Sequence, residues 1–262
     1  MTAPPPPRAN YNRLAHLYDS QPYREKPVDP HLLAFLAARP ALDPASLAAL
    51  DMACGTGNQL VANRTRLPRA RLAGLDVFGG MLNQARRKTR AVLWVQADAA
   101  APPFPGNSFH YISNQFAFHH VRRKRAMLRA VFRLLRPGGQ FVMTNIAPHN
   151  MTGWLCYRYF PAALAVDRRD FLSPKTLTDV AEQVGFVQIS LDLNRRTEEQ
   201  DLRQFAQTAR RRDTCSQLTA ISDADYRAGL RRLEADLRAA GDAPLSLLSE
   251  VCLLTLKAGK GE

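Results

Sequence analysis

Long apolar runs are missing from this 262-residue chain. No stretch approaches the roughly 20 apolar residues that a helix needs to span a bilayer, so we expect no transmembrane segment. The N-terminus carries Pro4 to Pro7 where an export signal would have an apolar core, so we expect no export signal. These two absences predict a cytoplasmic protein.

Cysteine is scarce as well. Cys54, Cys156, Cys215 and Cys252 are scattered along the chain, and no two of them form a C-x-x-C pair. This spacing argues against a zinc site and against a disulfide framework, and it fits a reducing cytosol. The sequence therefore predicts no bound metal.

Lysine is also rare, since the chain has 6 Lys against 30 Arg, yet its formal net charge is +13. The arginines gather at 122–125 and at 210–212, in or near expected helices, where a solvated helix face is the simplest interpretation. A positive field can also attract RNA or an anionic small substrate. No appended RNA-binding domain is recognisable, so nucleic acid is the less favoured partner.

The most informative stretch is an apolar run from Leu47 to Met52 that contains Asp51 near its end and is followed by Gly55 and Gly57. This order is typical of a buried parallel strand that leads through a tight turn into a crossover helix. Glycine permits a positive φ and lets a ligand approach the backbone. The free N–H groups of the helix start then face that ligand.

Two further apolar runs end in acids, at Asp76 and at Asp98. Successive parallel strands deliver these carboxylates to the sheet edge where open α/β sheets bind ligands. A carboxylate after the second strand suits a ribose diol, and one after the third suits an exocyclic amine such as that of adenine. A nicotinamide dinucleotide would require a G-x-G-x-x-G run, but position 60 is Leu60.

Five ordered motifs resemble those of the class I S-adenosylmethionine-dependent methyltransferases, in the small-molecule branch that includes the ubiquinone and menaquinone C-methyltransferases. They lie at 51–57, 76–82, 98–105, 118–121 and 134–139. The resemblance covers roughly residues 47–187. Ala53 stands where the family has its first glycine, and Gly79 stands where it has serine.

The resemblance implies an enzyme that binds S-adenosyl-L-methionine. The cofactor-binding residues that it implies are Tyr18, Tyr23, Arg24, Asp51, Ala53, Gly55, Gly57, Asp76, Val77, Met81, Asp98, Ala99, Asn114 and Gln115. Tyr18, Tyr23 and Arg24 belong to an N-terminal segment that is expected either to cover the cofactor pocket or simply to dock on the sheet. Met81 is expected to pack in the core as readily as it contacts adenine.

Methyl transfer is an in-line displacement at a sulfonium carbon, so the protein chiefly supplies positioning. A general base is needed only when the acceptor must lose a proton, and histidine suits a hydroxyl acceptor. His119 and His120 follow the expected fourth strand and are the catalytic candidates, although one ring of the pair is alternatively a packing residue. His149 is a weaker candidate.

The predicted fold is α/β, with a Rossmann-like seven-stranded, mostly parallel sheet, helices on both faces and a helical cap inserted before the last strand. We expect an N-terminal tail and lid at 1–40, a cofactor domain at 41–193 and 245–262, and a helical insert at 194–244. An aromatic-rich loop at 148–166 would line a substrate pocket. The apolar stripes of the insert predict either a substrate cap or a homodimer contact.

The sequence therefore predicts transfer of a methyl group to O, N or C of a small molecule, such as an aromatic or polyketide-like metabolite or a quinone precursor. Two alternatives stay open. One is an RNA methyltransferase that uses the arginine clusters. The other is a methyltransferase-like protein whose bound cofactor has a role other than methyl transfer.

Overall fold

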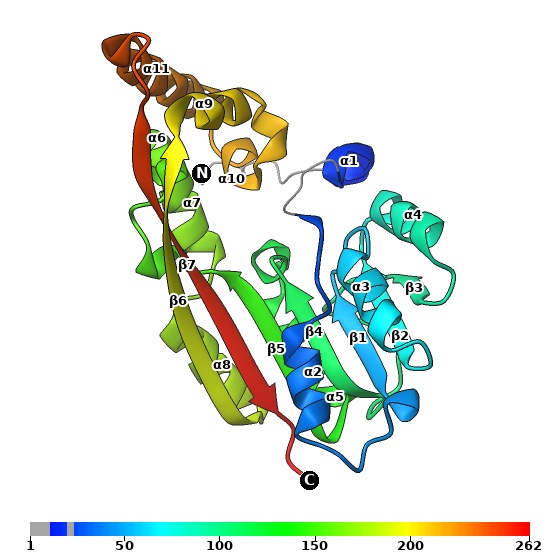
Figure 1. Cartoon of the computed structure of the whole chain (residues 1–262). Helices are drawn as coiled ribbons and strands as arrows, with labels where there is room; N and C mark the ends of the chain where they lie inside the picture. The colour runs from blue at the N-terminus through cyan, green and yellow to red at the C-terminus, as the bar shows by residue number, and fades with distance from the viewer. Residues whose placement is uncertain (1–10, 20–23) are drawn as a thin grey trace, which may run out of the picture. The chain divides into compact units, whose positions relative to one another are not determined.

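The computed structural model describes residues 11–19 and 24–262, and seven strands form one open sheet in the order β3-β2-β1-β4-β5-β7-β6 (Figure 1). The strands are β1 (Ala48–Met52), β2 (Arg71–Asp76), β3 (Leu93–Gln96), β4 (Phe109–Gln115), β5 (Leu135–Ile146), β6 (Val187–Asp201) and β7 (Ser246–Gly259). The prediction of a Rossmann-like, mostly parallel sheet is confirmed.

The first five strands of the sheet are parallel because each is followed by a crossover. Strand β1 pairs in parallel with both β2 and β4, and all five of its residues are buried. A central parallel strand is covered on both faces, which explains its continuous apolar run. Strand β7 runs antiparallel to β5, since Gly138 bonds to Lys260 at one end and Ala147 bonds to Cys252 at the other.

The helices begin and end at residues that the local sequence explains. Asp29 caps α2 through a hydrogen bond from His31 N–H, and Pro30 occupies the first position of this helix, where a missing N–H costs nothing. The helices that alternate with the strands are α2 (Pro30–Ala37), α3 (Asn58–Arg66), α4 (Gly79–Lys88), α5 (Lys124–Leu134) and α8 (Pro174–Val184).

The chain divides into two compact units. The described part of one, the sheet unit, consists of 11–19, 24–145, 175–192 and 255–262, and that of the other, the helical unit, consists of 146–174 and 193–254. Strands β6 and β7 contribute residues to both units. The sheet unit has a buried apolar core around β1 and α2, which includes Leu32, Phe35, Leu47 and Tyr111.

The helical unit differs from the expectation in two places. The aromatic-rich stretch 148–166 is not a loop, because it contains α6 (Leu155–Tyr159) and the start of α7 (Pro161–Asp170). Its aromatic side chains at 157, 159 and 160 are buried, and Pro161 starts a new helix. Strand β6 also continues past residue 193, where the cofactor domain was expected to end, to Asp201.

The helical insert expected before the last strand forms a hairpin of helices, although β6 occupies its first residues up to Asp201. The hairpin consists of α9 (Leu202–Arg210) and α11 (Asp223–Ala240), which pack against each other, with the short α10 (Ser216–Thr219) between them. The Tyr226 hydroxyl donates to the carbonyl oxygens of Ala209 and Arg210, at 2.8 and 3.1 Å. Among the described helices, none has both the length and the apolar character that crossing a membrane requires.

The contact between α11 and Phe160 allows packing to be tested against helix propensity. A Cβ at Gly229 would lie 2.1 Å from Phe160 Cδ1, and Phe160 is almost fully buried. Alanine is favoured over glycine in a helix by about 1 kcal/mol. We nevertheless expect Gly229→Ala to lower the free energy of unfolding by roughly 1–3 kcal/mol, because the added methyl group overpacks the site.

Urea denaturation of the full chain measures this change. The exposed substitution Ala235→Gly on the same helix is the control, with an expected loss of about 1 kcal/mol from propensity alone. A Gly229→Ala variant more stable than the parent would contradict the packing argument.

Candidate functional site

The turn after β1 is built from three residues with left-handed backbone. Ala53, Gly55 and Gly57 have φ values of 59°, 55° and 76°. Glycine adopts this conformation without strain, whereas alanine at Ala53 incurs about 1–2 kcal/mol. The three positions that the sequence assigned to a ligand-binding turn are therefore the ones where the backbone bends.

Trp94 of β3 explains why two of the nearby positions are glycine. A Cβ at Gly57 would lie 2.3 Å from Trp94 Cη2, and one at Gly74 would lie 2.6 Å from Trp94 Cζ3. The indole N–H donates to Thr89 O at 3.1 Å, which fixes the ring in place. The indole ring thus packs directly against the backbone of the turn.

Asp76, at the end of β2, connects this turn to the helix that follows. Its carboxylate accepts from Gly55 N–H at 2.8 Å and from Phe78 N–H at 2.9 Å. Burial raises the pKa of Asp76, and these backbone donors oppose that shift. Each carboxylate oxygen keeps a further lone pair, so Asp76 can still accept from the hydroxyls of a ligand.

Asp51 is the most perturbed acid of the site. It is 4% exposed and accepts from Ser113 Oγ at 2.9 Å. Burial and the neighbouring charges of Asp29 and Asp76 raise the pKa of Asp51 to about 7, against the opposing effects of Ser113 and Lys26. A buried group of acids that repel one another favours a cationic ligand, because a positive charge would stabilise the ionised forms.

Asn114 and Gln115 end β4 beside this acid. Asn114 is fully buried, and its Nδ2 donates to Met52 O at 2.6 Å. Within the described part of the chain, Asn114 Oδ1 is buried and has no hydrogen-bond partner, so it can accept from a ligand. Gln115 instead donates to Gln59 Oε1 at 3.0 Å.

The other cofactor-binding residues expected after β2 and β3 differ in how exposed they are. Val77 is 55% exposed, while Met81 and Ala99 are buried. The side chain of Asp98 is half exposed and pairs with Arg123 at 2.8 Å. The Ala100 N–H and the Arg123 guanidinium lower the pKa of Asp98, so it is ionised near neutral pH.

The N-terminal helix α1 (Tyr11–Tyr18) is tied to the turn by the residue that follows it. Asp19 accepts from Thr56 Oγ1 at 2.7 Å and from Asn58 Nδ2 at 2.9 Å, and it pairs with Lys88 at 2.6 Å. Burial raises the pKa of Asp19, but these three partners outweigh it and lower the pKa overall. The sequence did not single out Asp19, because its partners come from the turn, α3 and α4, far along the chain.

Tyr18 and Arg24, expected as pocket residues, interact with each other. The Arg24 guanidinium lies 3.9 Å from the centre of the Tyr18 ring and donates to its hydroxyl at 2.6 Å. Tyr23 lies outside the described residues. Tyr18 also packs edge-on against Tyr11, at 6.2 Å between ring centres.

The histidine pair lies in a short 3-10 helix, Phe118–His120, that follows β4. The two rings have different surroundings. His120 is partly exposed, and its Nε2 lies 2.9 Å from the Tyr11 hydroxyl. His119 is buried, with Nδ1 3.2 Å from Asn145 Nδ2, and its ring centre lies 3.8 Å from that of His120. The sequence did not single out Tyr11 as a site residue, because it lies 109 positions from His120 along the chain.

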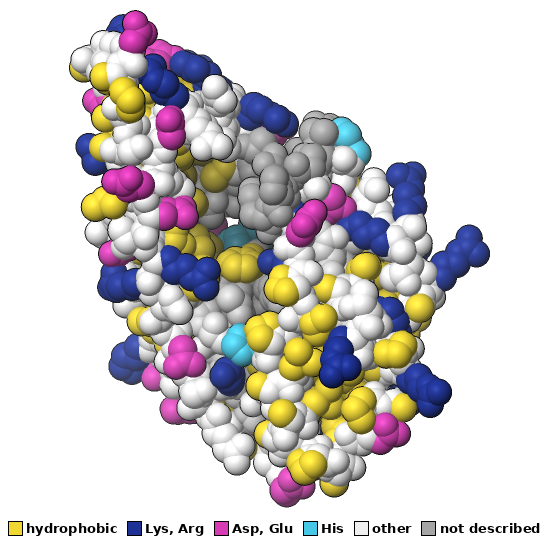
Figure 2. All heavy atoms as spheres, in the orientation of Figure 1, with side chains coloured by type: hydrophobic (Ala, Val, Ile, Leu, Met, Phe, Trp, Pro, Cys, Tyr) yellow, Lys and Arg dark blue, Asp and Glu magenta, His cyan; other side chains and the backbone are white. Residues whose placement is uncertain are grey.

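The two predicted arginine clusters are largely engaged within the protein. Arg123 pairs with Asp98, and Arg125 donates to Gln183. Arg210 pairs with Glu234 at 3.6 Å, and Arg212 pairs with Asp223 at 2.5 Å. On the face drawn in Figure 2, Lys and Arg side chains are scattered among acidic and apolar ones. Arg123 and Arg210 nevertheless stay more than half exposed.

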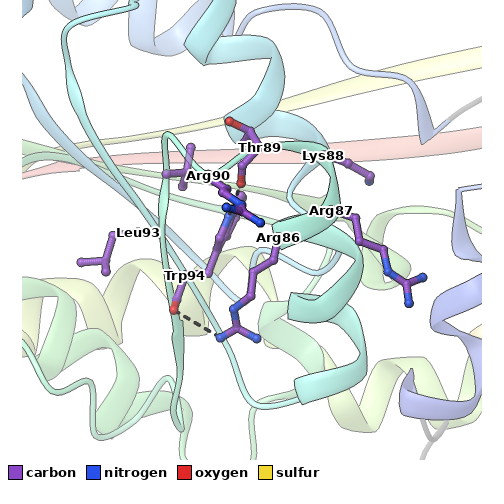
Figure 3. A pocket seen from close by; sticks show the side chains of 8 residues that line it. Arg86, Arg87, Lys88, Thr89, Arg90, Leu93 and Trp94 are labelled. Carbon is purple, nitrogen blue, oxygen red and sulfur yellow. Dashed lines mark hydrogen bonds between the residues drawn. The ribbon is translucent and has the colours of Figure 1, made fainter.

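A third basic group, which the sequence did not single out, surrounds a surface pocket of about 780 Å³. Its lining consists of Arg86, Arg87, Lys88, Thr89, Arg90, Val92, Leu93 and Trp94. In Figure 3 the Arg86 guanidinium reaches Trp94 O, at 3.5 Å. Two of these residues also contact the turn after β1, since Lys88 donates to Thr56 O at 2.9 Å and Trp94 packs against Gly57.

Comparisons with known proteins agree with this geometry. Residues 49–139 match the family model of the methyltransferase domain. The demethylmenaquinone methyltransferase of Thermus thermophilus is 36% identical over 112 residues, which are 41% of this chain and 51% of that protein. The chain thus spans about half the length of the curated relatives it matches.

Two solved structures show the same fold. The Haemonchus contortus phosphoethanolamine N-methyltransferase 2 in complex with S-adenosyl-L-methionine has a TM-score of 0.55 at 19% identity, over 88% of this chain and 52% of that one. The [4+2]-cyclase SpnF has a TM-score of 0.56 at 17% identity, over 99% of both chains. The predicted resemblance to class I methyltransferases is confirmed.

The raised pKa of Asp51 predicts a pH-dependent stability. Below about pH 4 this acid is neutral in both the folded and the unfolded chain. Between pH 4 and 7 only the unfolded chain loses the proton, so the folding stability that Asp51 contributes is lost as pH rises toward 7. We expect Asp51→Asn to gain stability relative to the parent as pH rises from 5 to 8.

Thermal unfolding across this pH range measures that difference. The exposed acid Asp192 provides the matched control, since Asp192→Asn is expected to follow the parent at every pH. A constant gap between the Asp51→Asn variant and the parent across the range would show that Asp51 titrates normally.

Proposed function

We propose that this chain, whose residues 49–139 match a methyltransferase domain, transfers the methyl group of S-adenosylmethionine to a small hydroxylated aromatic acceptor of the quinol type. The observation that carries the proposal is the group of buried acids at the ends of β1 and β2, beside the left-handed turn. The acceptor class rests on the relatives, which are named demethylmenaquinone methyltransferases.

The acids fit the charge of this cofactor, which carries a cationic sulfonium and a cationic ammonium. Burial raises the pKa values of Asp51 and Asp76, so a cation would lower the cost of ionising them. The buried Asn114 Oδ1 provides an acceptor that the described residues leave unused. The site therefore provides negative charge and one unused hydrogen-bond acceptor for the ammonium end of the cofactor.

The sugar and base of the cofactor fit the remaining residues of the site. Asp76 is held in place by two backbone N–H groups and keeps lone pairs for two hydroxyls of a ribose. Buried Met81 would pack beneath the base, and Asp98 would accept from its exocyclic amine. Gly55 and Gly57 allow the ligand to approach the turn closely.

When bound, S-adenosylmethionine supplies an electrophilic methyl carbon, and the chain supplies position and a proton acceptor. A ring hydroxyl that loses its proton makes both its oxygen and the adjacent ring carbon more nucleophilic. We assign that proton to the imidazole of His120, because His120 is partly exposed whereas His119 is buried. Tyr11 acts as a positioning residue, because its hydroxyl lies 2.9 Å from Nε2 and orients the ring.

A second function is favoured by one comparison. The [4+2]-cyclase SpnF has the same fold over 99% of this chain, so the fold alone also serves a protein with another named reaction. In that case the bound cofactor would not be consumed. Methyl transfer would form one S-adenosylhomocysteine for each methylated product, whereas the second function would form none. Measuring S-adenosylhomocysteine therefore distinguishes the two functions.

Calorimetric titration with S-adenosylmethionine and S-adenosylhomocysteine tests cofactor binding. We expect one site per chain, and we expect Asp76→Asn to weaken binding by roughly 10- to 100-fold, since hydrogen bonds to the ribose are lost. Asp192→Asn serves as the matched control and should bind like the parent. Circular dichroism checks that the Asp76→Asn variant is folded.

Absence of binding to the folded parent protein would overturn the cofactor assignment. Equal affinity of the parent and Asp76→Asn for the cofactor would show that the protein binds it without the proposed contact of Asp76.

Assay of labelled methyl transfer to a panel of demethylated naphthoquinols and other hydroxylated aromatics tests the catalytic residue. With the acceptor that is turned over best, we expect His120→Asn to lower kcat by about 100-fold or more and to leave cofactor affinity unchanged. Tyr11→Phe should cost roughly 5- to 10-fold, because it removes one hydrogen bond, and should shift the pH profile of kcat.

His149→Asn is the control in this series. His149 bonds to Phe171 O at 3.1 Å in the helical unit, so its substitution should preserve kcat. A His120→Asn variant within threefold of the parent would exclude this residue as the base.

A further inference from the structure

The surface pocket lined by residues 86–90 and 92–94 takes no part in the proposed methyl transfer. Its volume of about 780 Å³ is within the usual range of small-molecule sites. The lining comes from the end of α4, the start of β3 and the segment between them, all within the sheet unit. None of these residues is assigned to the cofactor or to the methyl acceptor, so a ligand of this pocket would be a further one.

The pocket carries positive charge that the protein itself does not neutralise. Its lining contains four cationic side chains and no acid. Lys88 pairs with Asp19, at 2.6 Å between Nζ and Oδ2. Arg86 and Arg87 donate only to amide or carbonyl oxygens, and Arg90 has no ion pair or side-chain hydrogen bond with any described residue. Three guanidinium charges are therefore left without a carboxylate within the described part of the chain.

The position of these arginines at the end of α4 explains only part of this charge. The carboxyl end of a helix carries about −0.5 elementary charge, which favours nearby cations but does not balance three of them. Arg90 also lies beyond Lys88, the last residue of the helix. The charge that remains favours an anionic ligand.

The free donors of the pocket suit a phosphate group. A guanidinium group has five N–H donors in a planar fork that matches phosphate oxygens, and Arg86 uses only some of them, on Asn83 Oδ1 and Trp94 O. Thr89 Oγ1 accepts from a backbone N–H at 3.1 Å, which leaves its O–H to donate. In Figure 3 the side chains of Arg86 and Arg90 extend beside Trp94, whereas Arg87 points away from it.

The rest of the lining is apolar. Leu93, at the start of β3, is 59% exposed, and Trp94 next to it is partly exposed. The indole cannot turn freely, because its N–H donates to Thr89 O at 3.1 Å. An apolar or aromatic group that covered Leu93 would remove apolar surface from water, which is favourable.

We infer that this pocket binds an organic phosphate, with the phosphate on the three unpaired arginines and an apolar body against Leu93. A phosphate monoester carries about 1.5 to 2 negative charges near neutral pH, so it would offset most of the unpaired positive charge. A free organic phosphate and the headgroup of a phospholipid present this same chemistry.

Titration of the full chain with inorganic phosphate and with phenyl phosphate, followed by ³¹P NMR, tests this inference. We expect saturable binding of both, with phenyl phosphate bound about three- to tenfold more tightly because its ring covers Leu93. Leu93→Asn should remove most of that difference and leave the affinity for inorganic phosphate unchanged.

Matched double variants separate a site from a general effect of charge. Arg86→Gln combined with Arg90→Gln should weaken both phosphates by about tenfold or more. Arg122→Gln combined with Arg129→Gln removes the same two charges elsewhere and should bind like the parent. All four arginines are exposed, so we expect both double variants to fold, and circular dichroism checks this.

Sedimentation with vesicles distinguishes the two sources of the phosphate. Phosphatidylcholine vesicles with and without phosphatidic acid are the probes. Binding that needs both phosphatidic acid and the pair Arg86 and Arg90 would identify a lipid headgroup. Binding of phenyl phosphate without sedimentation would identify a free organic phosphate.

The inference would be overturned if neither phosphate bound saturably. An equal loss of affinity in the two double variants would overturn it too, because the effect would then come from net charge alone. Displacement of phenyl phosphate by S-adenosylhomocysteine would place the phosphate in the cofactor site instead of this pocket.

Discussion

Two hydrogen bonds to one carboxylate hold the functional end of the sheet together. Asp76 accepts from Gly55 N–H and from Phe78 N–H, so the turn after β1 and the start of α4 are fixed by the same side chain. Without this carboxylate, the N–H groups of Gly55 and Phe78 would lose these partners in a partly buried place. The acids, the indole ring and the N-terminal helix are all arranged around this junction.

Helix α1 is attached near this junction through contacts at both of its ends. Asp19 contacts the turn and Lys88 at one end of the helix, and Tyr11 contacts His120 at the other. Gly80 N–H also donates to the Asn12 side chain between them. The N-terminal segment therefore links the turn after β1 to the short segment that carries the proposed base.

The sequence predicted the order of strands and helices well because its signals are local. Gly55 and Gly57 mark the turn, and Asp76 and Asp98 mark the ends of strands. Contacts made across long separations were not predictable: Tyr11 and His120 are 109 positions apart, and Asp19 and Thr56 are 37 apart. The stretch 148–166 lacks a clear period, so its short helices were taken for a loop.

The two tryptophans of the chain lie one in each unit. Trp94 packs beneath the glycine turn, while Trp154 stands edge-on to Tyr157, at 4.9 Å between ring centres. Indole emission depends on the local environment, so replacing one tryptophan by phenylalanine leaves a fluorophore that reports on a single unit. The melting of the sheet unit and that of the helical unit can then be recorded separately, without any added label.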